Sequence, residues 1–207
     1  MMTELFNETP VVPVVVIDEV TKAIRIADTL LSAGIETIEV TLRTDVALMA
    51  IEEIASAKPE ICVGAGSIRQ VGQISEAISA GARFFVSPGF NAGIIAEAKR
   101  RQAVFIPGAA TATEVMQLAE HGYDFVKFFP AELSGGVTML KALSAPLPEV
   151  RFFPTGGITA DLALSYLELP CVKCIGGSWF VPAEKIREGD FDWIYREALR
   201  VTELLNG

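Results

Sequence analysis

The chain has 207 residues, 51% of them hydrophobic and 21% charged, with a formal net charge of -9 at pH 7. This hydrophobic content is enough for a full core and excludes an intrinsically disordered chain. An acidic chain without a basic cluster is a poor match for nucleic acids or anionic membranes, so we expect a small-molecule partner.

Neither a membrane span nor an export signal is predicted. No apolar stretch approaches the roughly 18 residues that a span requires, and the first residues, MMTELFNETP, lack a basic start and an apolar core. We expect a cytoplasmic protein. Its three cysteines fit reduced thiols, and the single C-x-x-C pattern, Cys171 and Cys174, has no second Cys or His cluster that would complete a metal site.

Short apolar runs, spaced by roughly 20 to 30 residues, predict eight strands. In chain order they cover residues 11–17, 37–42, 61–67, 84–89, 104–109, 125–131, 150–157 and 171–179. Helical patterns lie between them. One covers residues 18–34, with Asp18 as the expected N-cap and Gly34 as the stop, and the next covers residues 44–59 and opens on Thr44.

The strands also group in pairs. Gly34, Gly81 and Gly122 each precede an even-numbered strand, while odd-numbered strands end in GAGS, PGAAT or PTGGIT, which gives a βαβα unit of about 45 residues. Four units predict one α/β domain over residues 1–207, a (β/α)8 TIM barrel with a short N-terminal extension before the first strand. A doubly wound open sheet is the alternative.

One predicted strand carries an unusually polar face. Alternate residues of a barrel strand face the interior, and within residues 37–43 the apolar and polar positions have opposite parity. The apolar set is Ile38, Val40 and Leu42, and the polar set is Thr37, Glu39, Thr41 and Arg43. We therefore expect the polar set to point inward, unless this is an edge strand with one wet face.

Lys127 interrupts another predicted strand. It shares parity with Phe125 and Phe129, so it is expected in the same interior, near the carboxyl end of its strand. A buried ammonium group is costly unless it is paired or loses its proton, so Lys127 is either part of a structural ion pair or catalytic. Lys173 also interrupts a predicted strand, but we expect its amine to reach solvent near the start of that strand.

A partly desolvated amine can attack a ketone and form a Schiff base, which then accepts electrons from a neighbouring carbon–carbon bond. Glu39 is the candidate general base and Arg43 the neighbouring cation, although Glu39 could serve only as an ion-pair partner. The single histidine, His121, fits a helix end. This scarcity of histidine favours a lysine mechanism over a metal-dependent one.

Two glycine-rich turns follow the last two predicted strands, TGGI at 155–158 and GGSW at 176–179. Barrels commonly bind phosphate at this place, because backbone N–H groups can approach an anion where no side chain intrudes. The two turns together indicate a phosphate site.

The motifs EVTLRT, VGAGS, SPG, IPG, VKFFPAE, PTGGI and CIGGSW occur in this order from Val11 onward. They resemble the 2-keto-3-deoxy-6-phosphogluconate (KDPG) aldolases. The resemblance implies a cofactor-independent Schiff-base lyase with a (β/α)8 barrel, usually a homotrimer, which cleaves KDPG to pyruvate and glyceraldehyde 3-phosphate in Entner–Doudoroff carbohydrate metabolism. Several members also cleave 4-hydroxy-2-oxoglutarate to pyruvate and glyoxylate.

By this resemblance, Lys127 forms the Schiff base, Glu39 is the general acid and base, and Arg43 holds the pyruvyl carboxylate. The other implied substrate contacts are Pro88, Phe129 and Thr155 near pyruvate, Gly156, Gly157, Gly177 and Ser178 near phosphate, and Ser67.

The chain departs from the family pattern at two places. Ser67 stands where relatives commonly carry Thr, and Ile17 and Asp18 stand where many carry Arg or Lys, which predicts a lower affinity for phosphate. A barrel isomerase or synthase acting on a phosphorylated substrate, or a non-catalytic barrel that binds a sugar phosphate, is the alternative function. Neither would need an inward lysine beside Glu39 and Arg43.

Overall fold

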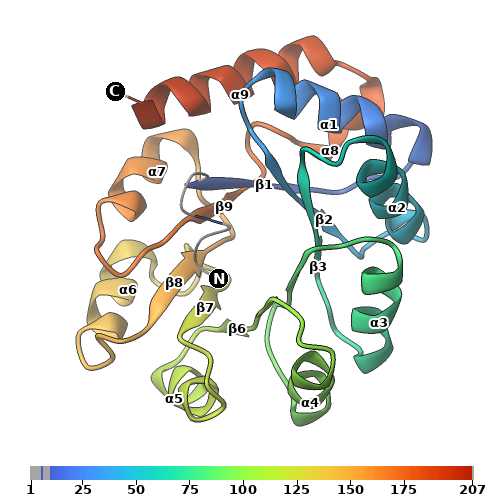
Figure 1. The fold of residues 1–207 in the computed structure, drawn as a ribbon. Helices are drawn as coiled ribbons and strands as arrows, with labels where there is room; N and C mark the ends of the chain where they lie inside the picture. The colour runs from blue at the N-terminus through green and yellow to red at the C-terminus, as the bar shows by residue number, and fades with distance from the viewer. Residues whose placement is uncertain (1–5, 7–9, 207) are drawn as a thin grey trace.

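A computed structural model describes residue 6 and residues 10–206 of the chain. It is an α/β fold in which parallel strands form a curled layer and the helices lie around its outside (Figure 1). The strands are β1 (Val11–Val15), β2 (Thr37–Thr41), β3 (Cys62–Gly66), β4 (Phe84–Val86), β5 (Phe105–Ile106), β6 (Gly108–Ala109), β7 (Phe125–Phe128), β8 (Arg151–Pro154) and β9 (Ile175–Gly177).

The helices alternate with these strands as the sequence pattern predicts. A 3-10 helix, η2 (Val20–Lys22), precedes the first α-helix. The α-helices are α1 (Ala23–Ser32), α2 (Ala47–Ala57), α3 (Val71–Ser79), α4 (Ala92–Arg100), α5 (Ala112–Glu120), α6 (Gly136–Ser144), α7 (Ala160–Leu167), α8 (Ala183–Glu188) and α9 (Phe191–Asn206). Among the described residues, no helix has both the length and the apolar character needed to cross a bilayer.

The strands form two parallel sheets with the orders β5-β4-β3-β2-β1-β9 and β6-β7-β8. The single strand predicted over residues 104–109 is divided at Pro107, which has no N–H to donate to a ladder. Its first part, β5, pairs with β4, and its second part, β6, pairs with β7. Parallel bridges from Phe152 to Val172 and from Thr155 to Gly176 connect β8 with the segment that contains β9.

Three predicted boundaries are wrong. Asp18 does not cap the first helix, which begins at Ala23 after the 3-10 turn, and the Asp18 carboxylate instead pairs with Arg187 at 3.2 Å. Thr44 does not cap α2, because its hydroxyl donates to the carbonyl of Ile17 at 2.6 Å. The last strand begins at Ile175, so Lys173 is half-buried in the irregular segment before β9.

The predicted helix stops at glycine are confirmed. Gly34, Gly81 and Gly122 follow α1, α3 and α5 with φ angles of 80°, 91° and 82°. These left-handed conformations are costly for other residues, so glycine ends each helix cleanly.

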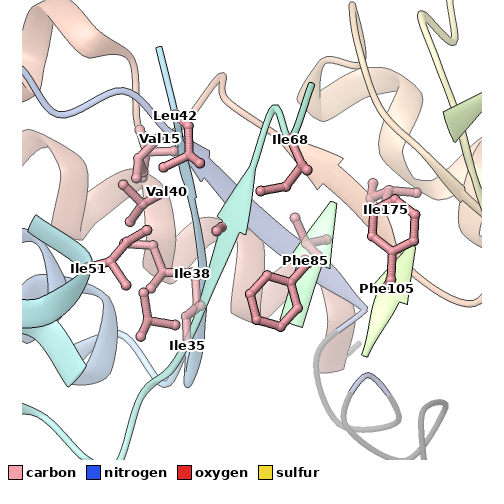
Figure 2. Close-up of a cluster of buried hydrophobic side chains, with 14 of the residues drawn as sticks. Val15, Ile35, Ile38, Val40, Leu42, Ile51, Ile68, Phe85, Phe105 and Ile175 are labelled. Carbon is pink, nitrogen blue, oxygen red and sulfur yellow. The ribbon is translucent and has the colours of Figure 1, made fainter. Parts of the chain in front are cut away.

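Within the observed bounds of β2 and β7, the predicted parity of the strand residues is also confirmed. One buried cluster lies between strands and helices, where Ile38 and Val40 of β2 lie beside Ile51 of α2 (Figure 2). A second buried cluster fills the interior between the strands: Phe6, Val12, Cys62, Phe84, Val86, Ile106, Phe125, Phe153 and Cys174. We call Phe6, Phe84, Phe125 and Phe153 the aromatic interior. Within it, the Phe6 ring centroid is 5.3 Å from that of Phe84 and 5.6 Å from that of Phe125.

Candidate active site

A buried amine and a buried carboxylate meet in the interior. Lys127 Nζ of β7 lies 3.5 Å from Glu39 Oε1 of β2, although the two residues are 88 positions apart in the chain. Glu39 is fully buried and Lys127 is 5% exposed. The parity that predicted both side chains inside therefore brings them into one ion pair.

Glycine on the neighbouring strand makes room for this carboxylate. Gly66 of β3 pairs in register with Thr41 of β2, and a Cβ built at Gly66 would lie 2.1 Å from Glu39 Oε1. Gly64, two residues earlier on the same face, makes room for the Phe84 ring, which a Cβ would approach to 2.3 Å. The VGAGS motif thus leaves two inward positions of β3 without a side chain.

The surroundings of the pair are aromatic and contain polar atoms without partners. Lys127 Nζ is 5.3 Å from the Phe129 ring centroid and 5.8 Å from that of Phe153. Glu39 Oε2 and Thr155 Oγ1 are buried without a hydrogen-bond partner in the structure. Buried polar atoms are normally satisfied, so these two oxygens are the ones at this site that a bound substrate could pair with.

A cavity of about 430 Å³ opens at the carboxyl ends of the strands. Six of the predicted substrate contacts line it: Arg43, Phe129, Thr155, Gly156, Gly157 and Ser178. The other lining residues are Val14, Val16, Thr41, Ile158, Gly176, Val181, Pro182 and Ala183. Lys127 and Glu39 are not lining residues, but the Phe129 ring, whose centroid is 5.3 Å from the Lys127 amine, connects the buried pair with the cavity wall.

Arg43 does not point into the buried interior as its parity predicted. Strand β2 ends at Thr41, the backbone N–H of Arg43 donates to the carbonyl of Thr41 at 2.8 Å, and the side chain is exposed at the cavity wall. Its Nε donates to Ser67 Oγ at 3.1 Å, which places Ser67 beside the cavity. A guanidinium group is always charged, so hydration at the wall is less costly than burial.

Three predicted contacts lie outside the cavity lining: Ser67, which reaches the cavity wall through its hydrogen bond with Arg43, and Pro88 and Gly177. Pro88 is exposed in a separate groove with Ile68 and Phe90. Gly177 is buried against the indole of Trp179, whereas Gly176 faces the cavity and lies against the Thr155 hydroxyl. Parity could have found Gly176, because Ile175 packs toward the helices and its neighbour must face inward.

Other chemistry-bearing side chains are not part of this ion pair. His121 is exposed at the C-cap of α5. In residue 6 and residues 10–206, no group of three or more His, Cys, Asp or Glu side chains is arranged to hold a metal ion. Cys171 and Cys174 are both free thiols, and burial raises the pKa of Cys174 well above its usual value.

An amine and a carboxylate paired near a cavity, toward the carboxyl ends of parallel strands, are the arrangement that an α/β enzyme with a reactive lysine would need. The family model described as "KDPG and KHG aldolase" matches residues 2–197 of the chain. The protein therefore belongs to the KDPG and KHG aldolase family, and the resemblance read from its motifs is confirmed.

Individual relatives agree over nearly the whole chain. The KHG/KDPG aldolase of Escherichia coli K12 is 43% identical over 194 residues, which cover 94% of this chain and 91% of that protein. The crystal structure of the Legionella pneumophila KDPG aldolase, with pyruvate captured as a covalent carbinolamine, has a TM-score of 0.94 and is 40% identical, covering 97% of this chain and 98% of that one. The Zymomonas mobilis ZM4 enzyme with 3-phosphoglycerate has a TM-score of 0.90 and is 42% identical, covering 96% and 93%.

Proposed function

We propose that this protein is a Schiff-base aldolase that cleaves KDPG to pyruvate and glyceraldehyde 3-phosphate. The observation that carries the proposal is the buried pair of Lys127 and Glu39, 3.5 Å apart near the cavity. The relative from Legionella pneumophila, whose structure holds pyruvate as a covalent carbinolamine, supports the same chemistry.

Catalysis begins at the amine of Lys127. The neutral amine attacks the C2 carbonyl carbon of the substrate and forms a carbinolamine, and loss of water then gives an iminium ion. Glu39 lies close enough to take a proton from the ammonium form of Lys127 and to return it to the hydroxyl group that leaves as water, after which Glu39 is again a carboxylate. The Phe129 and Phe153 rings exclude water from one side of the amine and tolerate the positive charge of the iminium.

Cleavage follows from the same pair. Glu39 removes the proton of the C4 hydroxyl group, the C3–C4 bond breaks, and its electrons move to the iminium to form an enamine. The aldehyde leaves, C3 of the enamine takes a proton, and water releases pyruvate and regenerates the amine. Glu39 can supply the proton that it took earlier, so one carboxyl group serves both steps.

The cavity wall supplies the binding contacts. Arg43, oriented by Ser67, holds the pyruvyl carboxylate, and the partnerless hydroxyl of Thr155 and the Phe129 ring border the pyruvyl group. For the phosphate end we assign Gly156, Gly157 and Ser178, which line the same cavity. We assign no substrate contact to Pro88 or Gly177, because both lie outside the cavity lining.

The site also fits 4-hydroxy-2-oxoglutarate, which would give pyruvate and glyoxylate by the same steps. The relative from Escherichia coli is named as an aldolase of both kinds. Arg43 is the only charged residue of the cavity lining in the described part of the chain, and Asp18 is paired with Arg187. Phosphate is therefore held by neutral donors, and we expect its removal from the substrate to reduce kcat/KM moderately, by about tenfold.

The wider setting is part of the proposal. We infer one closed (β/α)8 barrel over residues 1–207, supported by residues 105–109, which pair with both sheets, and by the bridges between β8 and the β9 segment. We further propose a cytoplasmic homotrimer acting in the Entner–Doudoroff route. Exposed apolar side chains such as Met49 and Met116 are available for assembly. A monomer-sized particle in light scattering at micromolar concentration would contradict the trimer.

Covalent trapping tests the function directly. Borohydride added with pyruvate reduces the iminium, so it should inactivate the protein and leave a lactyl-sized mass on the peptide that contains Lys127. Lys127→Arg keeps the charge but cannot form the imine, and it should abolish both trapping and turnover. Glu39→Gln should still be trapped while cleavage slows by about 10²- to 10³-fold.

Two outcomes decide against the proposal. A label on Lys173 would mean that another lysine carries the reaction. No label at all, with KDPG bound but not cleaved, would favour the isomerase, synthase or non-catalytic alternatives.

A further inference from the structure

The segment after β7 and the turn after β8 remain bonded to each other beyond the ends of their strands. The backbone N–H of Ala131 donates to the carbonyl of Thr155 at 2.8 Å, and that of Glu132 donates to the carbonyl of Gly156 at 3.1 Å. Glu132 therefore lies directly beside the turn that lines the cavity.

Glu132 also contacts this turn through its side chain. A Cβ at Gly157 would lie 2.8 Å from Glu132 Cβ and 3.0 Å from its Cγ, so the glycine backbone rests against the stem of Glu132. Gly156 and Gly157 have φ angles of 103° and 81°, conformations that few other residues adopt. Glycine is a flexible residue, and a turn with two of them needs support from its neighbours to keep one shape.

The carboxylate of Glu132 is held in turn by Tyr166. The Tyr166 hydroxyl donates a hydrogen bond to Glu132 Oε1. Tyr166 is fully buried on α7, the helix that follows the glycine turn (Figure 1). Burial and the neighbouring Glu132 raise the pKa of Tyr166 well above its usual value, so the hydroxyl keeps its proton and remains a donor.

Gly136 completes the arrangement by leaving space for the hydrogen bond. A Cβ at Gly136 would lie 3.1 Å from Glu132 Oε1 and 3.4 Å from the Tyr166 hydroxyl. Glu132 thus bonds to both ends of the segment from Gly156 to Tyr166, through its backbone N–H at Gly156 and through its carboxylate at Tyr166. Both ends of the glycine turn are fixed, one by β8 and the other by α7.

We infer that Glu132 and Tyr166 form a brace that fixes the shape of the Gly156–Gly157 turn and thereby its affinity for the substrate's phosphate. Neither residue belongs to the cavity lining, so both are positioning residues rather than catalytic ones. The inference rests on the proposed function, which assigns the turn to phosphate. It adds two residues whose effect is specific to one end of the substrate.

Tyr166→Phe tests the brace, because it keeps the ring and removes the hydroxyl group. We expect the KM for KDPG to rise about tenfold, the loss of one hydrogen bond to a charged group, with kcat unchanged. The KM for unphosphorylated 2-keto-3-deoxygluconate should change less than about twofold, since it makes no phosphate contact. Tyr123→Phe is the matched control: it alters another buried tyrosine, packed edge-on against Phe105, and should leave both KM values unchanged.

Glu132 provides a second, independent test if Tyr166→Phe does not fold. Glu132→Gln keeps the stem and an amide oxygen that accepts from Tyr166, so its KM for KDPG should stay within about twofold of wild type. Glu132→Ala removes both features and should match or exceed the effect of Tyr166→Phe.

The brace is overturned if KM rises equally for both substrates, if only the melting temperature falls, or if both KM values match wild type. Failure of the proposed function looks different, because the wild-type protein itself would then fail to cleave KDPG.

Discussion

The space between the strands has two halves that are built from the same strands in opposite ways. In the aromatic interior, the rings of Phe6, Phe84, Phe125 and Phe153 fill the space against one another. In the half toward the carboxyl ends, Glu39 and Lys127 form an ion pair, and Glu39 Oε2 has no hydrogen-bond partner among the described residues. Strand β7 supplies both Phe125 and Lys127, two residues apart and on the same face.

This difference separates the residues that stabilise the fold from the residues proposed to carry out its chemistry. Each buried ring removes a large apolar area from water and stabilises the folded state. A buried ion pair with an unsatisfied oxygen has the opposite effect, because its desolvation offsets the attraction between the charges. The aromatic half therefore supports a polar half that is costly to maintain and is useful only when a ligand enters.

Removing the ion pair altogether is the strongest test of this division. The double variant Lys127→Met with Glu39→Leu replaces both charges by apolar groups of similar size. Turnover should fall by at least about 10⁴-fold, while the free energy of unfolding stays the same or rises by about 1 kcal/mol. Steady-state assays and urea denaturation measure the two quantities.

The single variant Lys127→Met serves as the control, since it leaves Glu39 buried and unpaired and should cost about 3 kcal/mol of stability. A double variant clearly less stable than wild type would show that the polar half contributes to stability after all.

Truncating a ring of the aromatic interior should have the opposite effect: stability should fall while activity is retained. Phe6→Ala removes a ring that is 1% exposed and should reduce the free energy of unfolding by about 3 to 4 kcal/mol. At a temperature where the variant remains folded, its kcat/KM should stay within about twofold of wild type, because Phe6 is neither part of the ion pair nor one of the residues that line the cavity. Leu133→Ala, at a position that is 90% exposed, is the control and should leave stability nearly unchanged.

The two inward glycines of β3 allow the polar half and the aromatic half to be compared within one strand. Gly66→Ala pushes against the Glu39 carboxylate, so kcat should fall about 10- to 100-fold through misplacement of the base. Gly64→Ala pushes against the Phe84 ring and should cost about 1 to 3 kcal/mol of stability with kcat retained. Finding the two effects exchanged, or both effects in both variants, would mean that the halves are not separate.

Metal removal should have the smallest effect. The iminium itself accepts the electrons of the breaking bond, so no Lewis acid is required. Exhaustive dialysis against EDTA should leave KDPG cleavage unchanged. A loss of activity that zinc or magnesium restores would count against the lysine mechanism.

Most of what the sequence could predict came from the alternation of strand residues and from the residues that form turns. Alternation in residues 37–43 placed Glu39 inside, and the same rule placed Lys127 opposite it, because a strand allows each side chain only two directions. The rule stopped at strand ends: Arg43 lies beyond β2, where the backbone turns and parity no longer holds. Asp18 and Thr44 look like helix caps but are engaged by Arg187 and Ile17, partners that only the folded chain brings near.

The Glu132–Tyr166 contact shows more clearly what could not be predicted from the sequence. The two residues are 34 positions apart, on a loop and a helix, and no local pattern links them. Their pairing depends on the packing of α7 against the segment after β7, which is a property of the tertiary structure. Motif resemblance found the residues of the cavity wall but not the residues that support it.

The position of Phe6 has a consequence for the order in which the protein can be made. Phe6 is synthesised well before its partners Phe125 and Phe153, and β1 pairs along one edge with β9, which is also made late. Contacts between such distant parts of a chain form late, because loop closure must come first. A nascent chain that stalls before β9 therefore presents an exposed ring and an open strand edge, both of which promote aggregation.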